Sequence, residues 1–246
     1  LITLNDERYQ LLEKSGVDYL VVLPFNEDIA RRSFKQFMDD FLIAKFNVKY
    51  LLVGHDHHFG CDRINGFAQY KQYGEEKGVE VEREEPFKIK DDVISSSYVR
   101  RNILEGDVEK AAEALGYDYF LEGTVMPGYK MGRTIGYPTA NLAISDVRKL
   151  LPSAGVYIAT VNIEGDEKEY TSMLYIGSRP TFVNMSESKS IEVHMFDFNE
   201  DIYHKKIRIN LKKFFREELH FDNPSKLATQ LNKDKQAIKD WFAKKK

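Results

Sequence analysis

Small, polar and conformationally special residues lie close together in the segment GRTIGYPTANL, residues 132–142. Gly132 and Gly136 have no side chain, so their backbone N–H groups can approach phosphate oxygens closely. The proline stiffens the turn, and we expect it to aim Thr139 and Asn141 at one point. A hydroxyl and an amide oxygen are hard donors that suit Mg²⁺ carrying ATP phosphates. A proline turn with structural Thr and Asn gives the same pattern, so this segment alone leaves both interpretations open.

A carboxylate further along the chain has the chemistry of a general base. Glu192 lies in the alternating stretch IEVHMFDF, residues 191–198, and shares a strand face with His194. If this face borders a ligand cavity, Glu192 would accept a proton from a substrate hydroxyl. A solvent-facing carboxylate and a structural histidine are the alternatives. In FFREELHF, Arg216 and Glu218 would line a flat aromatic ligand or close the end of a barrel.

Three serines precede two arginines in the segment VISSSYVRR, residues 93–101. The segment predicts a helix start, where free N–H groups and the positive end of the helix dipole attract anions. Hydroxyls and arginines at such an end suit a polyphosphate. The alternative is a serine N-cap followed by surface arginines.

The segment VGHDHHFG, residues 53–60, joins a strand end to a loop with three histidines and one aspartate. His55 and His57 would share one face if the strand continued, which would suit a metal ion. No further His or Cys cluster with ligand spacing completes such a site. We therefore favour a ligand loop at the carboxyl end of a parallel strand, with a polar surface loop as the alternative.

Strand and helix patterns alternate in the first part of the chain, and this alternation predicts the elements that position these residues. The predicted strands are 18–25, 48–54 and 79–83, and the predicted helices are 34–46, 66–78, 96–105 and 107–115. The strands at 18–25 and 48–54 are apolar runs, so we expect both to be buried. Strands separated by helices of this length indicate βαβ units and a parallel sheet.

The pattern changes after about Tyr117 to short strands without helices between them. Residues 155–177 predict a hairpin around a Gly165-Asp166 turn, and alternation predicts further strands at 191–198 and 205–215. An apolar stripe after Pro224 predicts a C-terminal helix. We therefore predict two domains: an α/β domain over residues 1–116, then a small antiparallel β-barrel with a terminal helix over 117–246.

Composition limits the classes of partner and compartment. The chain has 246 residues, 42% hydrophobic and 30% charged, with a net charge of −3, which predicts a folded protein without nucleic-acid or membrane partners. Cys61 is the only cysteine, so no internal disulfide is possible and we expect a cytoplasmic location. No apolar run approaches the roughly 20 residues of a membrane span.

Together these segments resemble the bacterial bifunctional riboflavin kinase/FMN adenylyltransferase family over nearly the whole chain. GRTIGYPTANL is similar to the Pro-Thr-Ala-Asn signature of its flavokinase module, and GVY, IGSRPTF, EVHMFDF, DIYHKKI and REELHF follow in the family's order. VGHDHHFG with Arg63 and Gly66 resembles its VG-x-D-x-x-FG-x-x-R-x-G loop. ISSSYVR resembles its Ile-Ser-Ser-Thr-x-[Ile/Val]-Arg motif, with Ser97 in place of the threonine.

The resemblance implies a riboflavin kinase in the barrel. Glu192 would be the base for the ribityl 5′-hydroxyl of riboflavin, and Arg216, with Glu218, would contact the flavin. Thr139 and Asn141 would hold Mg²⁺ together with the co-substrate ATP. The residues near the nucleotide phosphates would be Gly123, Gly132, Gly136, Thr139 and Asn141.

The resemblance also implies a Rossmann-like nucleotidyltransferase domain at the N-terminus. There the phosphate of FMN would attack the α-phosphate of a second ATP, giving FAD and pyrophosphate. FMN and FAD would thus be products, not prosthetic groups. The implied residues of this site are Asp56, Phe59, Arg63, Ser95, Ser96 and Arg100.

One family element, Gly-x-Phe-Asp-Gly-x-His-x-Gly-His, has no counterpart in the sequence, which also starts without a methionine. From this we expect a truncated N-terminus, retained kinase activity, and weak or absent FAD formation. The alternatives are a monofunctional riboflavin kinase with a degenerate first domain and a non-catalytic flavin- or nucleotide-binding protein. The oligomeric state stays open.

Overall fold

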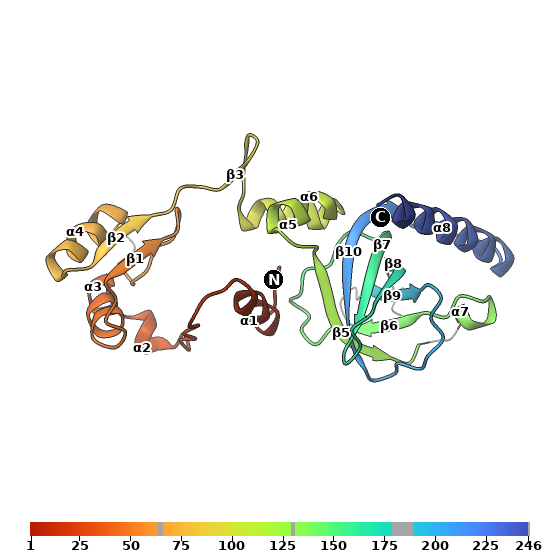
Figure 1. Ribbon diagram of the computed structural model, residues 1–246, viewed down its shortest axis with the longest axis horizontal. Coiled ribbons are helices and arrows are strands. Elements are labelled where there is room, and N and C mark those ends of the chain that lie inside the picture. The colour runs from red at the N-terminus through yellow and green to blue at the C-terminus, as the bar shows by residue number, and fades with distance from the viewer. Residues whose placement is uncertain (63–65, 129–130, 179–188, 246) are drawn as a thin grey trace. The chain divides into compact units, whose positions relative to one another are not determined.

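The computed structural model describes residues 1–62, 66–128, 131–178 and 189–245. Its contacts divide the chain into two compact units (Figure 1). Unit 1 consists of Leu1–Gln10 and Ser95–Lys246, and unit 2 is Leu11–Ile94. The helices predicted at 96–105 and 107–115 therefore belong by their contacts to the unit of the barrel. The predicted boundary after Gly116 concerns the two catalytic domains, which need not coincide with these compact units, and it stays a prediction.

Unit 2 is a small α/β unit built on one parallel strand pair. Its elements are α2 (Glu27–Ala30), α3 (Phe34–Phe37), the π-helix η1 (Met38–Ile43), β1 (Tyr50–Val53), α4 (Phe67–Lys77), β2 (Glu80–Arg83), β3 (Lys88–Ile89) and β4 (Asp92–Val93). Strands β1 and β2 pair in parallel, from Tyr50 with Glu80 to Val53 with Arg83. The predicted β-α-β succession is thereby confirmed in the described part of the chain.

The core of unit 2 is aromatic and small. Phe34, Met38 and Tyr70 are at most 3% exposed, and they pack with Val53 and Val81 from the two paired strands. The ring of Phe34 lies 5.2 Å from that of Tyr70. The helix predicted at 34–46 therefore exists, although its second half is a π-helix.

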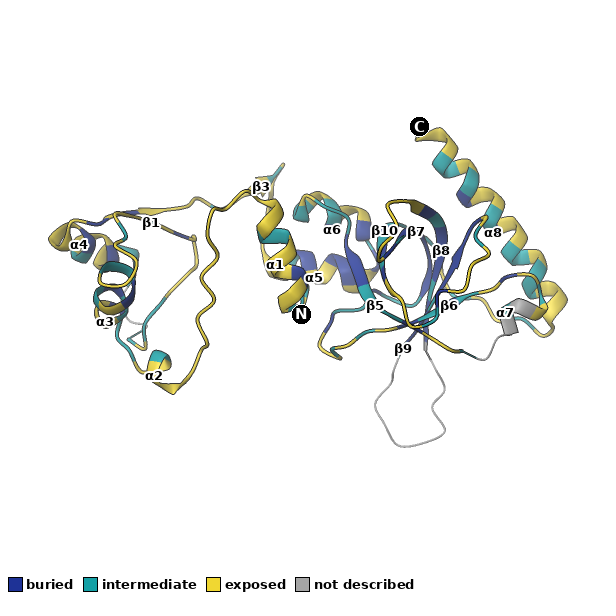
Figure 2. Ribbon diagram, turned by 60° about the horizontal axis from the view of Figure 1, so that its bottom comes forward, coloured by how far each residue is buried: buried dark blue, intermediate teal, exposed yellow. Residues whose placement is uncertain are grey.

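The buried strand predicted at residues 18–25 is wrong. These residues form no strand and are all exposed, with Tyr19 at 92% and Phe25 at 82% (Figure 2). An apolar run becomes a buried strand only when a neighbouring strand satisfies its backbone groups. Among the described residues, β1 pairs with β2 alone, so this segment has no strand beside it.

Unit 1 is a closed barrel with helices before and after it in the chain. Its elements are α1 (Asn5–Lys14, whose last residues fall in unit 2), α5 (Ser96–Glu105), α6 (Val108–Leu115), β5 (Phe120–Met126), α7 (Met131–Thr134), β6 (Ala140–Ala143), β7 (Gly155–Ile163), β8 (Glu169–Ser178), β9 (Lys189–Met195), β10 (Lys206–Arg216) and α8 (Pro224–Lys244). The strands close in the order β10-β5-β6-β9-β8-β7, and every pair is antiparallel. The predicted barrel and terminal helix are confirmed.

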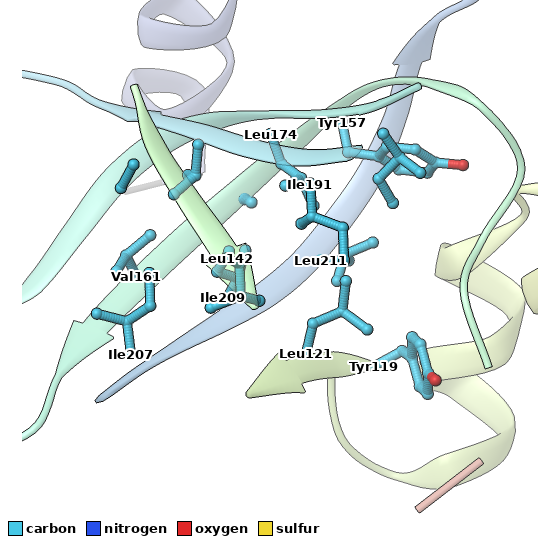
Figure 3. Close-up of a cluster of buried hydrophobic side chains, with 14 of the residues drawn as sticks. Tyr119, Leu121, Leu142, Tyr157, Val161, Leu174, Ile191, Ile207, Ile209 and Leu211 are labelled. Atoms are coloured by element: carbon cyan, nitrogen blue, oxygen red, sulfur yellow. The ribbon is translucent and has the colours of Figure 1, made fainter. Parts of the chain in front are cut away.

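Alternation along the strands fills the barrel with aliphatic side chains. Ile207, Ile209 and Leu211 of β10 are at most 2% exposed, and they share one core with Leu121 of β5 and Leu174 of β8 (Figure 3). Because side chains alternate across a regular strand, about half of the strand residues point away from this core. Those outward residues are free to build a site on the outer surface of the barrel.

Helix α8 covers one outer face of the barrel (Figure 1). Asn223 caps it by accepting from the Lys226 N–H at 2.9 Å, and Pro224 occupies the first turn. Its Ile238 is fully buried against Val156 and Met173 of the barrel. None of the helices in the described part of the chain combines the length and apolar composition that a membrane-spanning helix needs.

The first residues of the chain are tied to the barrel by a buried ion pair. Lys149 Nζ lies 2.7 Å from Glu7 Oε2, and the two side chains are 1% and 2% exposed. The ammonium group also donates to the Ile2 carbonyl at 2.9 Å and lies 4.8 Å above the Tyr119 ring. The segment Leu1–Gln10 is therefore held by specific polar contacts as well as by packing.

Candidate functional site

One row of outward residues crosses five strands of the barrel. Asn141 of β6 pairs with Glu192 of β9, which pairs with Tyr175 of β8. Tyr175 pairs with Val156 of β7, which pairs with Arg216 of β10. Directly paired residues lie on the same face of a sheet, so the row places an amide, a carboxylate, a phenol and a guanidinium side by side.

This row borders a cavity of about 570 Å³. Ile191 and Val193 flank Glu192 and are buried in the barrel core, so Glu192 points outward. The lining also includes apolar residues of the segment before α8 and of α8 itself, including Phe221 and Leu231. A cavity of this size with apolar walls and a few polar groups suits a flat organic ligand.

Thr139 and Glu192 meet at one wall of the cavity. Thr139 Oγ1 donates to Glu192 Oε2 at 3.1 Å, and both side chains are half-buried. The turn before Thr139 is closed by the Tyr137 N–H, which donates to the Gly132 carbonyl at 2.7 Å. A Cβ on Gly132 would lie 2.1 Å from the Tyr137 carbonyl oxygen, so the turn tolerates only glycine there. Gly136 adopts a left-handed φ of +80° in the same turn.

His194 is hydrogen-bonded to the same turn. Its Nδ1 lies 2.8 Å from the Pro138 carbonyl oxygen, so this nitrogen carries the proton and donates. Its buried Nε2 makes no hydrogen bond in the described ranges. Burial lowers the pKa of His194 below its ordinary value, and the nearby Lys235 lowers it as well, so the neutral ring is favoured. The structural role that the sequence left open for this histidine fits these contacts.

Arg216 is fixed at the opposite end of the row. Its Nε and Nη2 lie 3.0 and 2.7 Å from Asp234 Oδ2, and its Nη1 donates to the Glu217 carbonyl at 2.8 Å. Asp234 belongs to α8 and is 2% exposed. The guanidinium therefore has a buried counter-charge while it lines the cavity.

Glu218 is connected to the cavity by a hydrogen bond from Tyr175. The Tyr175 hydroxyl donates to Glu218 Oε1, and Tyr175 lines the cavity. Burial and the hydrogen bond to Glu218 raise the pKa of Tyr175 above its ordinary value, so the phenol stays protonated. The sequence identifies Glu218, but Tyr175 enters only through the register of β8 with β9.

A second cavity, of about 610 Å³, is also lined by Thr139. Pro138, Phe198 and Tyr203 are among the residues that line it. Thr139 is thus shared by two cavities, one of which contains Glu192.

Strand packing explains why residue 123 is a glycine. It lies in β5, and a Cβ there would lie 2.3 Å from the Ala143 carbonyl oxygen of the neighbouring β6. Only a residue without a side chain allows the two strands to approach so closely at this point. Its place near nucleotide phosphates stays a prediction.

The residues predicted for adenylyl transfer are divided between the two units. Asp56 is exposed in unit 2, and the ring of Phe59 stacks on Tyr70 at 4.3 Å as part of the core. Strand β1 ends at Val53, so His55 and His57 do not share a strand face. The described residues hold no cluster of three His, Cys, Asp or Glu side chains suited to a metal. Arg63 lies outside the described residues.

Ser95, Ser96 and Arg100 lie at the start of α5 in unit 1, as predicted. Ser95 caps this helix by accepting from the Tyr98 N–H at 3.2 Å. Ser96 and Arg100 are exposed. The serine cap and surface arginine of the simpler interpretation are present, and a helix start with exposed hydroxyl and guanidinium groups still suits a polyphosphate.

Two family models match this chain. A family model described as riboflavin kinase matches residues 115–242, and one described as FAD synthetase matches residues 1–98. The bifunctional riboflavin kinase/FMN adenylyltransferase of Bacillus subtilis is 36% identical over 254 residues, covering 99% of this chain and 76% of the relative. Its namesakes in Listeria monocytogenes and Escherichia coli are 34% and 32% identical, covering 99% and 96% of this chain and 76% and 74% of their own.

A solved structure also resembles the chain closely. A crystal structure described as a macrolide-efflux protein from Streptococcus pneumoniae has a TM-score of 0.88 and 33% identity. The match covers 98% of this chain and 76% of that protein. The same fold therefore exists in an experimental structure over nearly the full length of this chain.

Proposed function

This chain belongs to the family of bifunctional riboflavin kinase/FMN adenylyltransferases, and we propose that the cavity beside Thr139 and Glu192 is its riboflavin kinase site. The chain is an enzyme of flavin cofactor synthesis that phosphorylates riboflavin to FMN and transfers an adenylyl group to FMN. Riboflavin, FMN and ATP are its small-molecule substrates. The assignment of residues to these reactions is the proposal.

The observation that carries the proposal is the pair formed by Thr139 and Glu192. A carboxylate that already accepts a hydrogen bond from a hydroxyl at 3.1 Å is placed to accept one from a substrate hydroxyl. In the proposed reaction the ribityl 5′-oxygen forms a bond to the γ-phosphorus of ATP. The bond between that phosphorus and the β–γ bridging oxygen breaks, ADP leaves, and Glu192 takes the hydroxyl proton.

The two cavities would hold the two substrates. The cavity with Glu192 has apolar walls and Arg216, which suits a flavin ring and its polar edge. The second cavity would take the nucleotide, so that its phosphates reach Thr139. Phosphoryl transfer depends mainly on such positioning and on charge stabilisation.

Thr139 and Asn141 would hold Mg²⁺ with the ATP phosphates. Their oxygens are hard donors, and Asn141 pairs with Glu192 in the strand register, so the donor set fits the ion. When bound, Mg²⁺ would neutralise phosphate charge. The residues Gly132 and Gly136 would shape the turn that presents Thr139.

For the adenylyltransferase, the proposal keeps Asp56, Phe59 and Arg63 from the N-terminal loop, and Ser95, Ser96 and Arg100 from the start of α5. The support is the match of residues 1–98 to the FAD synthetase model and the exposed hydroxyl and guanidinium groups at a helix start. We also propose a cytoplasmic location, which suits the single cysteine.

The test is the substitution Glu192→Gln, assayed by chromatography of the flavin products with riboflavin, Mg²⁺ and ATP. Loss of the base should lower the rate of FMN formation by about 100- to 10,000-fold. Glu169→Gln is a matched control, because Glu169 also accepts from a threonine hydroxyl, that of Thr160 at 2.6 Å, elsewhere on the barrel. Normal turnover in Glu192→Gln would contradict the assignment of Glu192 as the general base.

A further inference from the structure

We propose that Asp234 on helix α8 is a positioning residue for riboflavin phosphorylation. It holds the guanidinium of Arg216 at the cavity wall in the orientation that meets the flavin. The inference rests on the proposed function of the cavity. It adds a residue that lies on a helix outside every motif of the sequence.

The contact between the two residues is short and mostly sheltered from water. Asp234 Oδ2 accepts from both Nε and Nη2 of Arg216, and the two side chains are 2% and 19% exposed. A hydrogen bond between charged groups is stronger than a neutral one, particularly where water is excluded. Since both donors converge on one oxygen, the plane of the guanidinium is restricted as well as its position.

The carboxylate itself is held on its other side. Gln230 Nε2 donates to Asp234 Oδ1 at 2.8 Å, one helical turn before Asp234. One turn after it, Ile238 is fully buried against the barrel, which fixes α8 at this level. Asp234 is therefore a rigid support, in contrast to a surface carboxylate that changes rotamer freely.

Arg216 keeps donors for a ligand. A guanidinium has five N–H donors, and three are used by Asp234 and by the Glu217 carbonyl. One N–H on each terminal nitrogen makes no hydrogen bond within the described part of the chain. Arg216 lines the cavity together with Tyr175, so a ligand there meets a planar cation with free donors. Carbonyl oxygens of a flavin ring accept such donors, and an aromatic ring stacks on such a cation.

A pair that only attaches α8 to the barrel would behave differently. Its loss would lower the melting temperature and leave the Michaelis constants of both substrates unchanged. A positioning pair acts on one substrate, so its loss should raise KM for riboflavin and leave KM for ATP alone. The kinetic constants therefore separate the two roles.

The experiment measures kcat and both Michaelis constants in Asp234→Asn, which keeps the shape of the side chain and removes its charge. We expect KM for riboflavin to rise about tenfold, with kcat and KM for ATP within about twofold of wild type. Arg216→Ala should raise KM for riboflavin at least as much. Adding Asp234→Asn to Arg216→Ala should then change nothing further, because Asp234 acts through Arg216. Asp234→Glu, which restores the charge, should recover part of the loss.

Asp240→Asn is the matched control. Asp240 lies on the same helix and accepts from Gln236, four residues before it, at 2.8 Å, but it is exposed. This variant should keep wild-type constants. If Asp234→Asn does not fold, Gln230→Met removes only the support of Oδ1, and KM for riboflavin should rise about fivefold.

The outcomes distinguish the inference from the function on which it rests. The role of Asp234 is overturned if KM for riboflavin is raised in Arg216→Ala but normal in Asp234→Asn. If Asp234→Asn does not fold, Gln230→Met takes its place in this comparison. Normal values in both Arg216→Ala and Asp234→Asn overturn the assignment of the cavity to riboflavin. Quenching of riboflavin fluorescence on binding measures Kd without turnover, and it should follow the same order among the variants.

Discussion

At the residue scale, the turn that carries Thr139 is hydrogen-bonded to a buried histidine whose neutral form is favoured. His194 donates from Nδ1 to the Pro138 carbonyl, and burial lowers its pKa below the ordinary value of 6.5. Below pH 6.5 the unfolded chain takes up a proton at this histidine while the folded chain resists it. Stability from the neutral ring is therefore complete above pH 6.5 and is lost as the pH falls through the folded pKa.

We expect His194→Asn to flatten this part of the pH dependence. The Asn side chain can still donate to the Pro138 carbonyl but cannot take up a proton. Thermal unfolding between pH 7 and pH 5, followed by the fluorescence of Trp241, should show a smaller loss of melting temperature than in wild type. His58→Asn, at an exposed position of unit 2, should keep the wild-type slope. Identical slopes in all three proteins would show that His194 does not contribute.

The site could be predicted from sequence only where its residues stand in local motifs. Thr139 and Glu192 are 53 positions apart, yet each stands in a motif that predicts a kinase residue, and a hydrogen bond joins them. Tyr175 and Asp234 were not predicted. Tyr175 enters through the register of β8 with β9, and Asp234 through the packing of α8, and neither is visible in a single segment. An acidic residue on the apolar stripe of the terminal helix was the available signal for Asp234.

At the scale of elements, the sequence shows the local periodicity of a strand or helix, but not which other elements pair with it or pack against it. The strands at 48–54 and 79–83 and the helix at 66–78 are confirmed because each has its neighbour within the same stretch of chain. The segment at 18–25 has the same apolar character and no strand beside it among the described residues, so it is exposed. Burial of an apolar run is decided by what pairs with it, which composition does not contain.

This difference can be tested with one substitution in each kind of segment. Val21 is 53% exposed and Val81 of β2 is 3% exposed. Val21→Lys should change the free energy of unfolding by less than about 0.5 kcal/mol, as surface substitutions do. Val81→Lys should cost several times more, because it buries an unpaired charge. Thermal unfolding measured by circular dichroism compares the two variants. A large loss of stability in Val21→Lys would contradict the exposed position of this segment and support a buried strand at 18–25.

At the scale of the whole molecule, sequence order and compact units do not coincide. Leu1–Gln10 belongs by contacts to the unit that contains the barrel, although the residues after it belong to unit 2. The buried ion pair of Glu7 with Lys149 makes this connection across 142 positions of sequence. Such a pair cannot be foreseen from either segment, since a glutamate and a lysine are ordinary surface residues elsewhere.

Removing one partner of this pair should destabilise unit 1. Lys149→Met leaves the Glu7 carboxylate buried, with the Leu4 N–H at 2.7 Å as its remaining donor, and should cost about 3–5 kcal/mol. Trp241 is the only tryptophan and lies in unit 1, so its fluorescence during denaturant unfolding reports on this unit.

Replacing both partners, Glu7→Leu with Lys149→Met, should recover part of the loss, because no charge is then left buried. Lys110→Met removes an exposed partner of Asp107 and serves as the control, with an expected cost below about 1 kcal/mol. If Lys149→Met costs no more than this control, the first residues are not held to the barrel by the ion pair. Their place in unit 1 would then depend on packing and backbone contacts alone.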